Sequence, residues 1–149
     1  MSRRRILNSN VAYVSRTGWF GLQYPVGWTV QEGDESISIY NPDSGHGAIN
    51  ASAYRTPGKV DARAELLENL ADNSPSIETE HVSVRCTDST QVASVGYEDG
   101  DNFHKIWFVV SRNYLILCNY ICGTEDKSEL PIVEEIVESV EVEPMMARN

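Results

Sequence analysis

Among the side chains that could take part in acid–base catalysis, His46 has the most favourable sequence context. It lies between two glycines in the stretch SGHG, where a flexible loop presents an imidazole that exchanges a proton near neutral pH. Acid–base catalysis also needs a group that orients the imidazole, and no Asp, Ser or Cys stands at a diagnostic spacing from His46. We therefore expect a turn residue. A small enzyme that uses His46 or Cys86 in a cleft remains the alternative to a binding protein.

Residues that bind metals are present, but without the spacing of a metal site. His81, Cys86 and His104 can meet if neighbouring strands bring them together, but zinc requires about four ligands in close geometric agreement, and no paired spacing occurs. The stretch EDGDN, residues 98–102, alternates acids as a calcium loop does, but it lacks the rest of that pattern and its closing Glu. We interpret it as a hairpin turn, and we expect no metal, no cofactor and no catalytic residue.

The cysteines indicate free thiols. Cys86, Cys118 and Cys122 are an odd number, whereas secreted disulfide frameworks use an even set. If CNYIC is a strand, Cys118 and Cys122 stand roughly 13 Å apart on one face, at ~3.3 Å per residue, which is too far for a bridge.

We expect neither an export signal nor a membrane-spanning segment in this sequence. The start MSRRRILNSN lacks the apolar core of a secretory signal, and no apolar run approaches the ~20 residues of a membrane helix. The glycosylation pattern NAS at Asn50 falls in an expected strand and is disregarded. We expect a cytoplasmic protein that does not insert into a membrane.

Charge is unevenly distributed along the chain. The formal net charge is −10, yet the first 16 residues carry four arginines and no acid, which leaves eight cations against 22 acids in the rest. We expect residues 1–16 to form a solvated basic arm, residues 17–143 a single domain, and residues 144–149 a frayed tail. Because the acidic domain repels polyanions, nucleic acid is excluded as the main partner.

Alternating apolar residues predict strands in most of the chain. Phe20–Tyr24 alternates until Pro25-Val26-Gly27 interrupts it before Trp28–Val30, which predicts a bent opening hairpin. Ser36–Tyr54 contains two alternating segments around the turn formers NPDSGHG, which predicts a second hairpin. Four further strands, joined by short links typical of an antiparallel meander, are expected at Ile77–Cys86, Gln91–Tyr97, His104–Ser111 and Tyr114–Cys122. In the last two of these strands, the side chains that point to either face of the sheet are apolar, which predicts central strands with both faces covered.

Two segments change to helical periodicity. Asp61–Asp72 places its leucines on one face, with Asp61 as the expected N-cap. Ser128–Val140 places Val133 and Ile136 on one stripe, and Pro131 falls in the first turn, where its missing N–H costs little. We expect both helices to cover the sheet.

The order of these elements and the aromatic opening resemble the PsbP-like fold family. The resemblance covers nearly the whole chain and is carried by Tyr24, Pro25, Gly27, Trp28, Asn41, Pro42 and Ser139. It implies a bacterial member with an α+β fold, in which an antiparallel sheet carries helices on both faces as an α/β/α sandwich. Family members include photosystem extrinsic subunits, a Ran-binding transport factor and bacterial chaperones of secreted effectors, so the resemblance implies partner binding without catalysis.

The aromatic opening GWFGLQYPVGWTV has two interpretations. Trp19, Phe20, Tyr24 and Trp28 form either a recognition patch, because Trp and Tyr dominate binding hot spots, or the open end of a small core, which needs large apolar side chains. We expect mainly core packing.

A stripe of acids on the terminal helix is the candidate partner-binding site. On a 3.6-residue wheel, Glu134, Glu138 and Glu141 lie roughly opposite the apolar stripe, and no lysine in that helix relieves their repulsion. The stripe is either a solvated face or a surface that steers a basic protein partner. The sequence thus predicts a non-enzymatic chaperone or adaptor, or an acidic inhibitor of a basic partner, and leaves the oligomeric state open.

Overall fold

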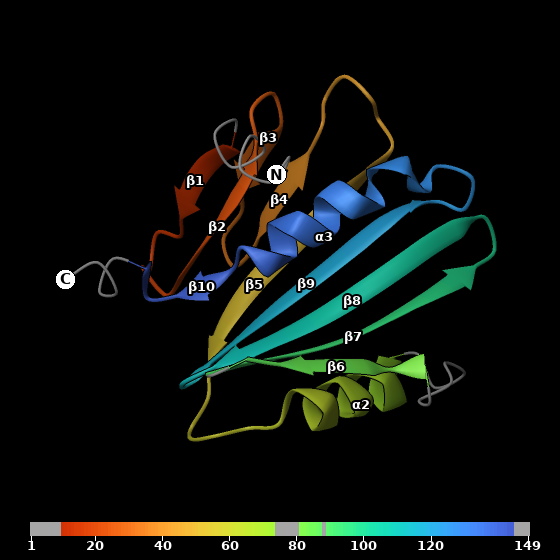
Figure 1. Cartoon of the computed structure of the whole chain (residues 1–149). Coiled ribbons are helices and arrows are strands. Elements are labelled where there is room, and N and C mark those ends of the chain that lie inside the picture. Colours follow the sequence, from red (N-terminus) through yellow and green to blue (C-terminus); the bar gives the residue numbers. More distant parts are fainter. Residues whose placement is uncertain (1–9, 74–80, 88, 145–149) are drawn as a thin grey trace.

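A computed structural model describes residues 10–73, 81–87 and 89–144 of this chain. These residues form two antiparallel sheets, two α-helices and a short 3-10 helix (Figure 1). The large sheet has the strand order β3-β4-β5-β9-β8-β7-β6. Its strands are β3 (Thr29–Glu32), β4 (Ile37–Tyr40), β5 (Gly47–Arg55), β6 (Ser83–Cys86), β7 (Thr90–Asp99), β8 (Asn102–Ser111) and β9 (Tyr114–Gly123). The small sheet has the order β1-β2-β10, with β1 (Asn10–Val14), β2 (Phe20–Pro25) and β10 (Glu141–Val142).

Strands β8 and β9 lie at the middle of the large sheet, as their apolar character predicted. Alternate side chains point to opposite faces: Trp107 and Val109 belong to the core on one side, and Ile106 and Phe108 to the core on the other. The meander β6-β7-β8-β9 and the hairpin β4-β5 confirm the predicted connections, because each consecutive pair is antiparallel.

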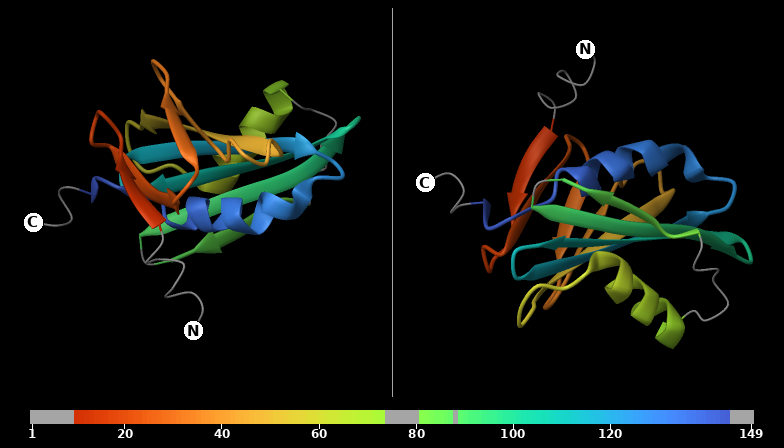
Figure 2. Two further views of the ribbon diagram at one scale, coloured as in Figure 1. Left: turned by 90° about the horizontal axis from the view of Figure 1, so that it is seen from above. Right: turned by 60° about the horizontal axis from the view of Figure 1, so that its bottom comes forward.

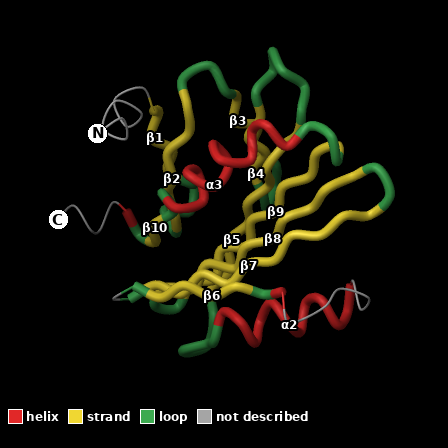
Figure 3. Tube along the Cα trace, turned by 45° about the vertical axis from the view of Figure 1, so that its right-hand side comes forward, coloured by secondary structure: helices red, strands yellow, loops and turns green. Residues whose placement is uncertain are grey.

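The helices cover opposite faces of the large sheet (Figures 2 and 3). Helix α2 (Ala62–Asn73) buries Leu66 and Leu70 against β7 and β8, and the Ala64 N–H donates to Asp61 Oδ2 at 2.9 Å, which confirms Asp61 as the N-cap. The short 3-10 helix η2 (Lys127–Glu129) leads into α3 (Leu130–Glu138), which buries Val133 and Ile136 on the other face. The α+β fold with an antiparallel sheet between helices is thus confirmed.

The opening hairpin was predicted wrongly. Strand β2 pairs with β1 and β10, whereas β3 pairs with β4 in the large sheet. The chain changes sheets at Pro25–Gly27, where the Trp28 N–H donates to the Pro25 carbonyl at 3.1 Å and Gly27 adopts φ 97°, a conformation that glycine tolerates. The single predicted sheet is therefore two sheets that share one core.

The N-terminal boundary also differs from the expectation. Strand β1 lies inside the range 1–16 that was expected to be a solvated arm, so Asn10–Val14 are part of the folded sheet. The three arginines at positions 3–5 and residues 77–80 of the predicted strand Ile77–Cys86 lie outside the described residues. Of the expected tail 144–149, only Pro144 is described, and it is buried.

Candidate functional site

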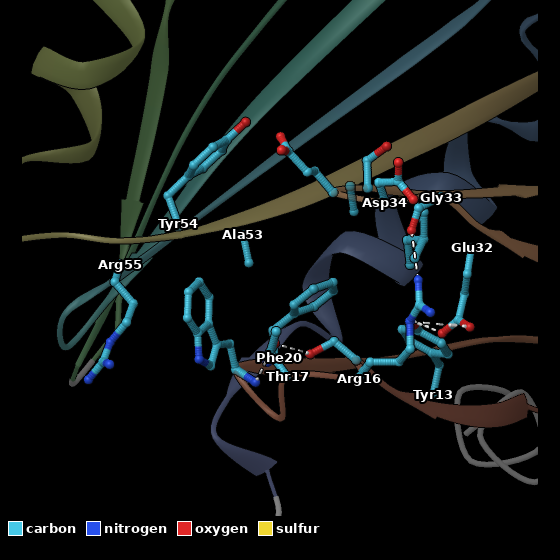
Figure 4. A pocket seen from close by; sticks show the side chains of 16 residues that line it. Tyr13, Arg16, Thr17, Phe20, Glu32, Gly33, Asp34, Ala53, Tyr54 and Arg55 are labelled. Carbon is cyan, nitrogen blue, oxygen red and sulfur yellow. Dashed lines mark hydrogen bonds and ion pairs between the residues drawn. The ribbon is translucent and has the colours of Figure 1, made fainter.

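The candidate site is a cavity of about 530 Å³ between the small sheet and the first strands of the large sheet (Figure 4). Two turns form its mouth: the β1–β2 turn around Arg16 and Thr17, and the β3–β4 turn from Gly33 to Ser36. The β1–β2 turn folds tightly because the Gly18 N–H donates to the Ser15 carbonyl at 2.9 Å, with Gly18 at φ 79°. The cavity is therefore set by the packing of one sheet against the other.

The interior of the cavity is apolar. Phe20, Ile37 and Ala51 are buried residues of the main core that line it, and Ala53 and Trp19 pack against the same cluster. Figure 4 shows Phe20 and Ala53 on facing sides of the space. Ligand sites are typically lined in this way, with apolar walls and a few polar groups at the margin.

A polar contact joins the two turns at one side of the mouth. The Arg16 Nη2 donates to the Gly33 carbonyl at 2.8 Å, and its Nε lies 3.8 Å from Glu32 Oε1. The Tyr13 hydroxyl donates to Glu32 Oε2 at 2.7 Å. Burial and this hydrogen bond to Glu32 raise the pKa of Tyr13, so the phenol remains a donor at neutral pH.

Carboxylates dominate the β3–β4 turn. Glu32 is engaged by Arg16, whereas Asp34 and Glu35 are exposed and have no ion-pair partner among the described residues. At the opposite end, the Arg55 guanidinium lies 5.8 Å from the centre of the Trp19 ring and 5.7 Å from that of Tyr114, an arrangement that favours cation–π attraction. The mouth therefore has an acidic side and a side already occupied by a cation.

The predicted acidic stripe does not exist as one helical face. Helix α3 ends at Glu138, and Glu141 lies in β10, opposite Gly21 of β2. The helix itself contains no lysine, but cations from elsewhere in the chain neutralise two of the acids, because Lys105 Nζ contacts Glu134 and Arg85 Nη2 lies 3.8 Å from Glu138. Both cations come from strands of the large sheet, so sequence spacing within the helix gave no sign of them.

A second cavity, of about 230 Å³, is lined in part by Glu141, which follows the end of α3. There Ser139, the C-cap of α3, accepts a hydrogen bond from the Gln23 N–H at 2.7 Å and contacts the Gln23 carbonyl at 3.3 Å. Ser139 therefore ties the helix to strand β2. Glu141 is exposed at the margin of this space.

His46, His104 and Cys86 lie in different parts of the structure. His46 Nδ1 faces Asp126 Oδ1 at 3.6 Å, His104 stacks on Tyr97 with ring centres 4.9 Å apart, and Cys86 is exposed on the edge strand β6. Neither His46 nor Cys86 lines either cavity described above. Within residues 10–73, 81–87 and 89–144, no group of three or more His, Cys, Asp or Glu side chains is arranged to hold a metal ion.

A buried carboxylate that the sequence did not indicate contacts the loop that contains His46. Glu129 of η2 is buried, accepts a hydrogen bond from the Ser44 hydroxyl, and accepts a second from the Tyr120 hydroxyl, 3.4 Å from Glu129 Oε1. These contacts fasten the β4–β5 loop to the segment before α3. We assign Glu129 a structural role, because all its contacts are internal.

The aromatic opening serves both the core and the cavity. Phe20 and Trp28 are buried, and Trp19 and Tyr24 pack partly buried against the same core, which confirms the expected packing. Trp19 and Phe20 also line the cavity. EDGDN forms the β7–β8 turn with Gly100 at φ 63°, and Asn50 lies within β5, both as expected.

The fold is that of an α+β protein with the PsbP-like architecture. A solved structure of cyanobacterial PsbP (CyanoP) from Synechocystis sp. PCC 6803 is similar, with a TM-score of 0.67 and 12% identity, over 90% of this chain and 92% of the other. A crystal structure from Bacteroides thetaiotaomicron VPI-5482 matches with a TM-score of 0.69 and 20% identity over 90% of this chain. This chain spans only 48% of the length of that protein.

The family follows from the sequence itself. The chain belongs to the family described as domain of unknown function DUF3805, whose model matches residues 8–148. No protein with a curated description matches the chain. No helix of the described residues is long and apolar enough to cross a membrane.

Proposed function

We propose that this protein is a non-enzymatic, cytoplasmic protein-binding module, a chaperone or adaptor or an inhibitor, that takes a basic protein partner at the cavity between its two sheets. The observation that carries the proposal is the apolar cavity with Glu32, Asp34 and Glu35 at its mouth. A volume of about 530 Å³ falls within the ~300–1,000 Å³ that ligand sites enclose. It accommodates an apolar anchor residue together with a neighbouring cation.

The apolar walls and the acids at the mouth contribute to binding in different ways. An apolar side chain that enters between Phe20 and Ala53 is desolvated, which provides affinity. A lysine or arginine beside it meets Asp34 and Glu35, which are not neutralised by ion pairs with other described residues. Charges at the rim act mainly on the association rate and on specificity.

The acids of the terminal helix are the alternative binding site for a basic partner. Glu134 and Glu138 already contact Lys105 and Arg85, so an incoming cation must compete for them, whereas Asp34 and Glu35 accept it without such competition. The small enzyme is supported only by His46 facing Asp126, and the absence of His46 from both described cavities favours the binding module.

A comparison of three matched variants tests the proposal. The intact chain is immobilised, its partner is captured from the native cells, and the association rate of the purified partner is measured. We expect Asp34→Asn with Glu35→Gln to slow association by about tenfold at low salt, and Ala53→Phe, which fills the cavity, to accelerate dissociation. The control, Glu68→Gln with Asp72→Asn on the exposed side of α2, changes charge equally and should leave both rates unchanged.

The same experiment separates the two acidic surfaces. Glu134→Gln, Glu138→Gln and Glu141→Gln together should have little effect on the association rate. If this triple variant loses binding while the cavity variants keep it, the helix is the site. If the partner is acidic, or binds all variants equally, the cavity is not the docking place.

A further inference from the structure

The face of the large sheet opposite α3 is covered over only part of its width. Helix α2 packs on β7 and β8, and no described helix or strand packs over β3, β4 and β5 on that side (Figures 2 and 3). Ile37, Ile39, Ile49 and Ala51 point into the core beneath α3, so their neighbours along each strand point the other way. The side chains of this uncovered part, here called the neutral face, are Thr29, Gln31, Ser38, Tyr40, Ala48, Asn50, Ser52, Tyr54, Asn119 and Ile121.

The neutral face contains no charged side chain, although 23% of the chain is charged and the net charge is −10. It is also not a hydrophobic patch, because hydroxyl and amide groups predominate over Ala48 and Ile121. A surface of this composition binds a partner that brings hydrogen-bonding groups but no charge, since a buried charge would find no counter-ion here.

Its polar groups are held in a row across three strands. The Ser38 hydroxyl donates to Asn50 Oδ1 at 2.5 Å, and Asn50 Nδ2 lies 3.5 Å from Asn119 Oδ1. These contacts fix the orientation of both amides, and each amide keeps donor or acceptor capacity for a ligand. The row is therefore preorganised for hydrogen bonding.

Two tyrosines flank this row. Tyr40 pairs in register with Ala48 at one end of β5, and Tyr54, which is 48% exposed, lies near the other end and receives a hydrogen bond from the Ser52 hydroxyl at 3.2 Å. The positions of Ala48 and Tyr54 along β5 are about 20 Å apart at ~3.3 Å per residue. Tyrosine rings offer an apolar surface with a polar edge, which suits the C–H faces of sugar rings.

The area of the neutral face limits the size of the partner that it can bind. Four strands ~4.8 Å apart give a width of about 19 Å, and a length of about 20 Å makes roughly 400 Å². A stable protein interface needs about 800 Å² from each partner, so neither a second copy nor another protein is accommodated on this face alone. We propose that the neutral face binds a short neutral oligosaccharide. This inference does not rest on the protein-binding cavity, with which the neutral face shares one residue, Tyr54.

Titration with neutral sugars, followed by NMR of the isotopically labelled full chain, tests the inference. The probes are cellotetraose, maltotetraose, xylotetraose and mannotetraose, each at millimolar concentration. At least one should shift the side-chain amide signals of Asn50 and Asn119 saturably. Asn50→Asp adds a charge at nearly constant shape, and Tyr54→Ala removes an exposed ring without touching the core. Each should weaken that binding by about tenfold, as expected for the loss of one well-placed contact.

The control is Asn113→Asp in the exposed β8–β9 turn, which should leave the affinity unchanged. The proposal is overturned if none of the four sugars shifts the signals of the neutral face, or if both variants bind as the parent does. It is also overturned if those signals change with protein concentration alone, because a second copy then covers the face. Failure here leaves the protein-binding proposal intact, since the cavity variants test that separately.

Discussion

The three cysteines illustrate how burial decides reactivity at the scale of single residues. Cys86 is exposed on the edge strand β6, whereas Cys118 and Cys122 point into the core from β9. Burial raises the pKa of Cys118 to about 12, and burial also raises the pKa of Cys122. Because the thiolate is the reactive form, the two buried thiols are protected in two ways: reagents cannot reach them, and they remain protonated.

We predict that a thiol reagent modifies one cysteine of the native protein at mildly alkaline pH and all three after denaturation without reductant. Counting the attached groups by mass spectrometry checks this result. Cys86→Ser should reduce rapid native labelling to none. Fewer than three reactive thiols after denaturation would reveal a disulfide, and rapid labelling of two or more in the folded state would show that β9 opens easily.

Residue roles were predictable where the interaction is local. Asp61 caps α2 by accepting a hydrogen bond from the N–H of Ala64, three residues further on, and Pro131 lies in the first turn of α3. Both roles were predictable because capping and turn chemistry depend on neighbours in the sequence. The ion pair of Lys105 with Glu134 joins positions 29 residues apart. No pattern in one sequence specifies such a pair, since it depends on how a helix crosses a sheet.

At the scale of elements, the end of helix α3 is attached to the small sheet by one side chain. Ser139 Oγ receives the Gln23 N–H at 2.7 Å and contacts the Ile136 carbonyl at 2.6 Å. Next to it, Gly21 of β2 leaves no room for a side chain, because an added Cβ would lie 2.8 Å from the Tyr13 carbonyl oxygen. The position of β2 therefore depends on a close fit with both β1 and α3.

We predict that Ser139→Ala lowers the free energy of unfolding by about 1–2 kcal/mol, because the partly buried Gln23 N–H loses its acceptor. Urea denaturation followed by circular dichroism measures the change. Ser128→Ala, at an exposed position of η2, is the matched control and should change stability by less than about 0.5 kcal/mol. Equal stability of the two variants would show that water replaces the lost contact at no cost.

Element prediction succeeded where periodicity was strong and failed where the chain changes sheets. The strands around His104–Ser111 and Tyr114–Cys122 follow from continuous apolar runs. The hairpin expected between Phe20–Tyr24 and Trp28–Val30 was wrong, because a Pro–Gly interruption is compatible with a tight turn and with a crossing between sheets. The cavity lies between strands that this crossing assigns to different sheets, β1 and β2 on one side and β3 to β5 on the other, and its location therefore could not be predicted from the sequence.

At the scale of the molecule, the acidic character of the chain sets its response to salt. The exposed ion pairs of the described residues, such as Arg85 with Glu138 at 3.8 Å, each contribute little. The net charge of −10, in contrast, produces repulsion over the whole surface, which opposes the compact state. Salt weakens both the ion pairs and the repulsion, and the larger of the two effects decides whether Tm rises or falls with salt.

We predict that raising NaCl from about 10 mM to about 500 mM at neutral pH increases Tm by about 3 °C, because the Debye length falls from ~30 Å to only a few ångströms and the repulsion is screened. This shift corresponds to about 1 kcal/mol for a chain of this size. Calorimetry at several salt concentrations measures it. Near the sequence pI of about 4.6 the net charge vanishes, and the same salt series should leave Tm almost unchanged. A decrease of Tm with salt at neutral pH would mean that the ion pairs outweigh the repulsion, and would contradict this account of the molecule's electrostatics.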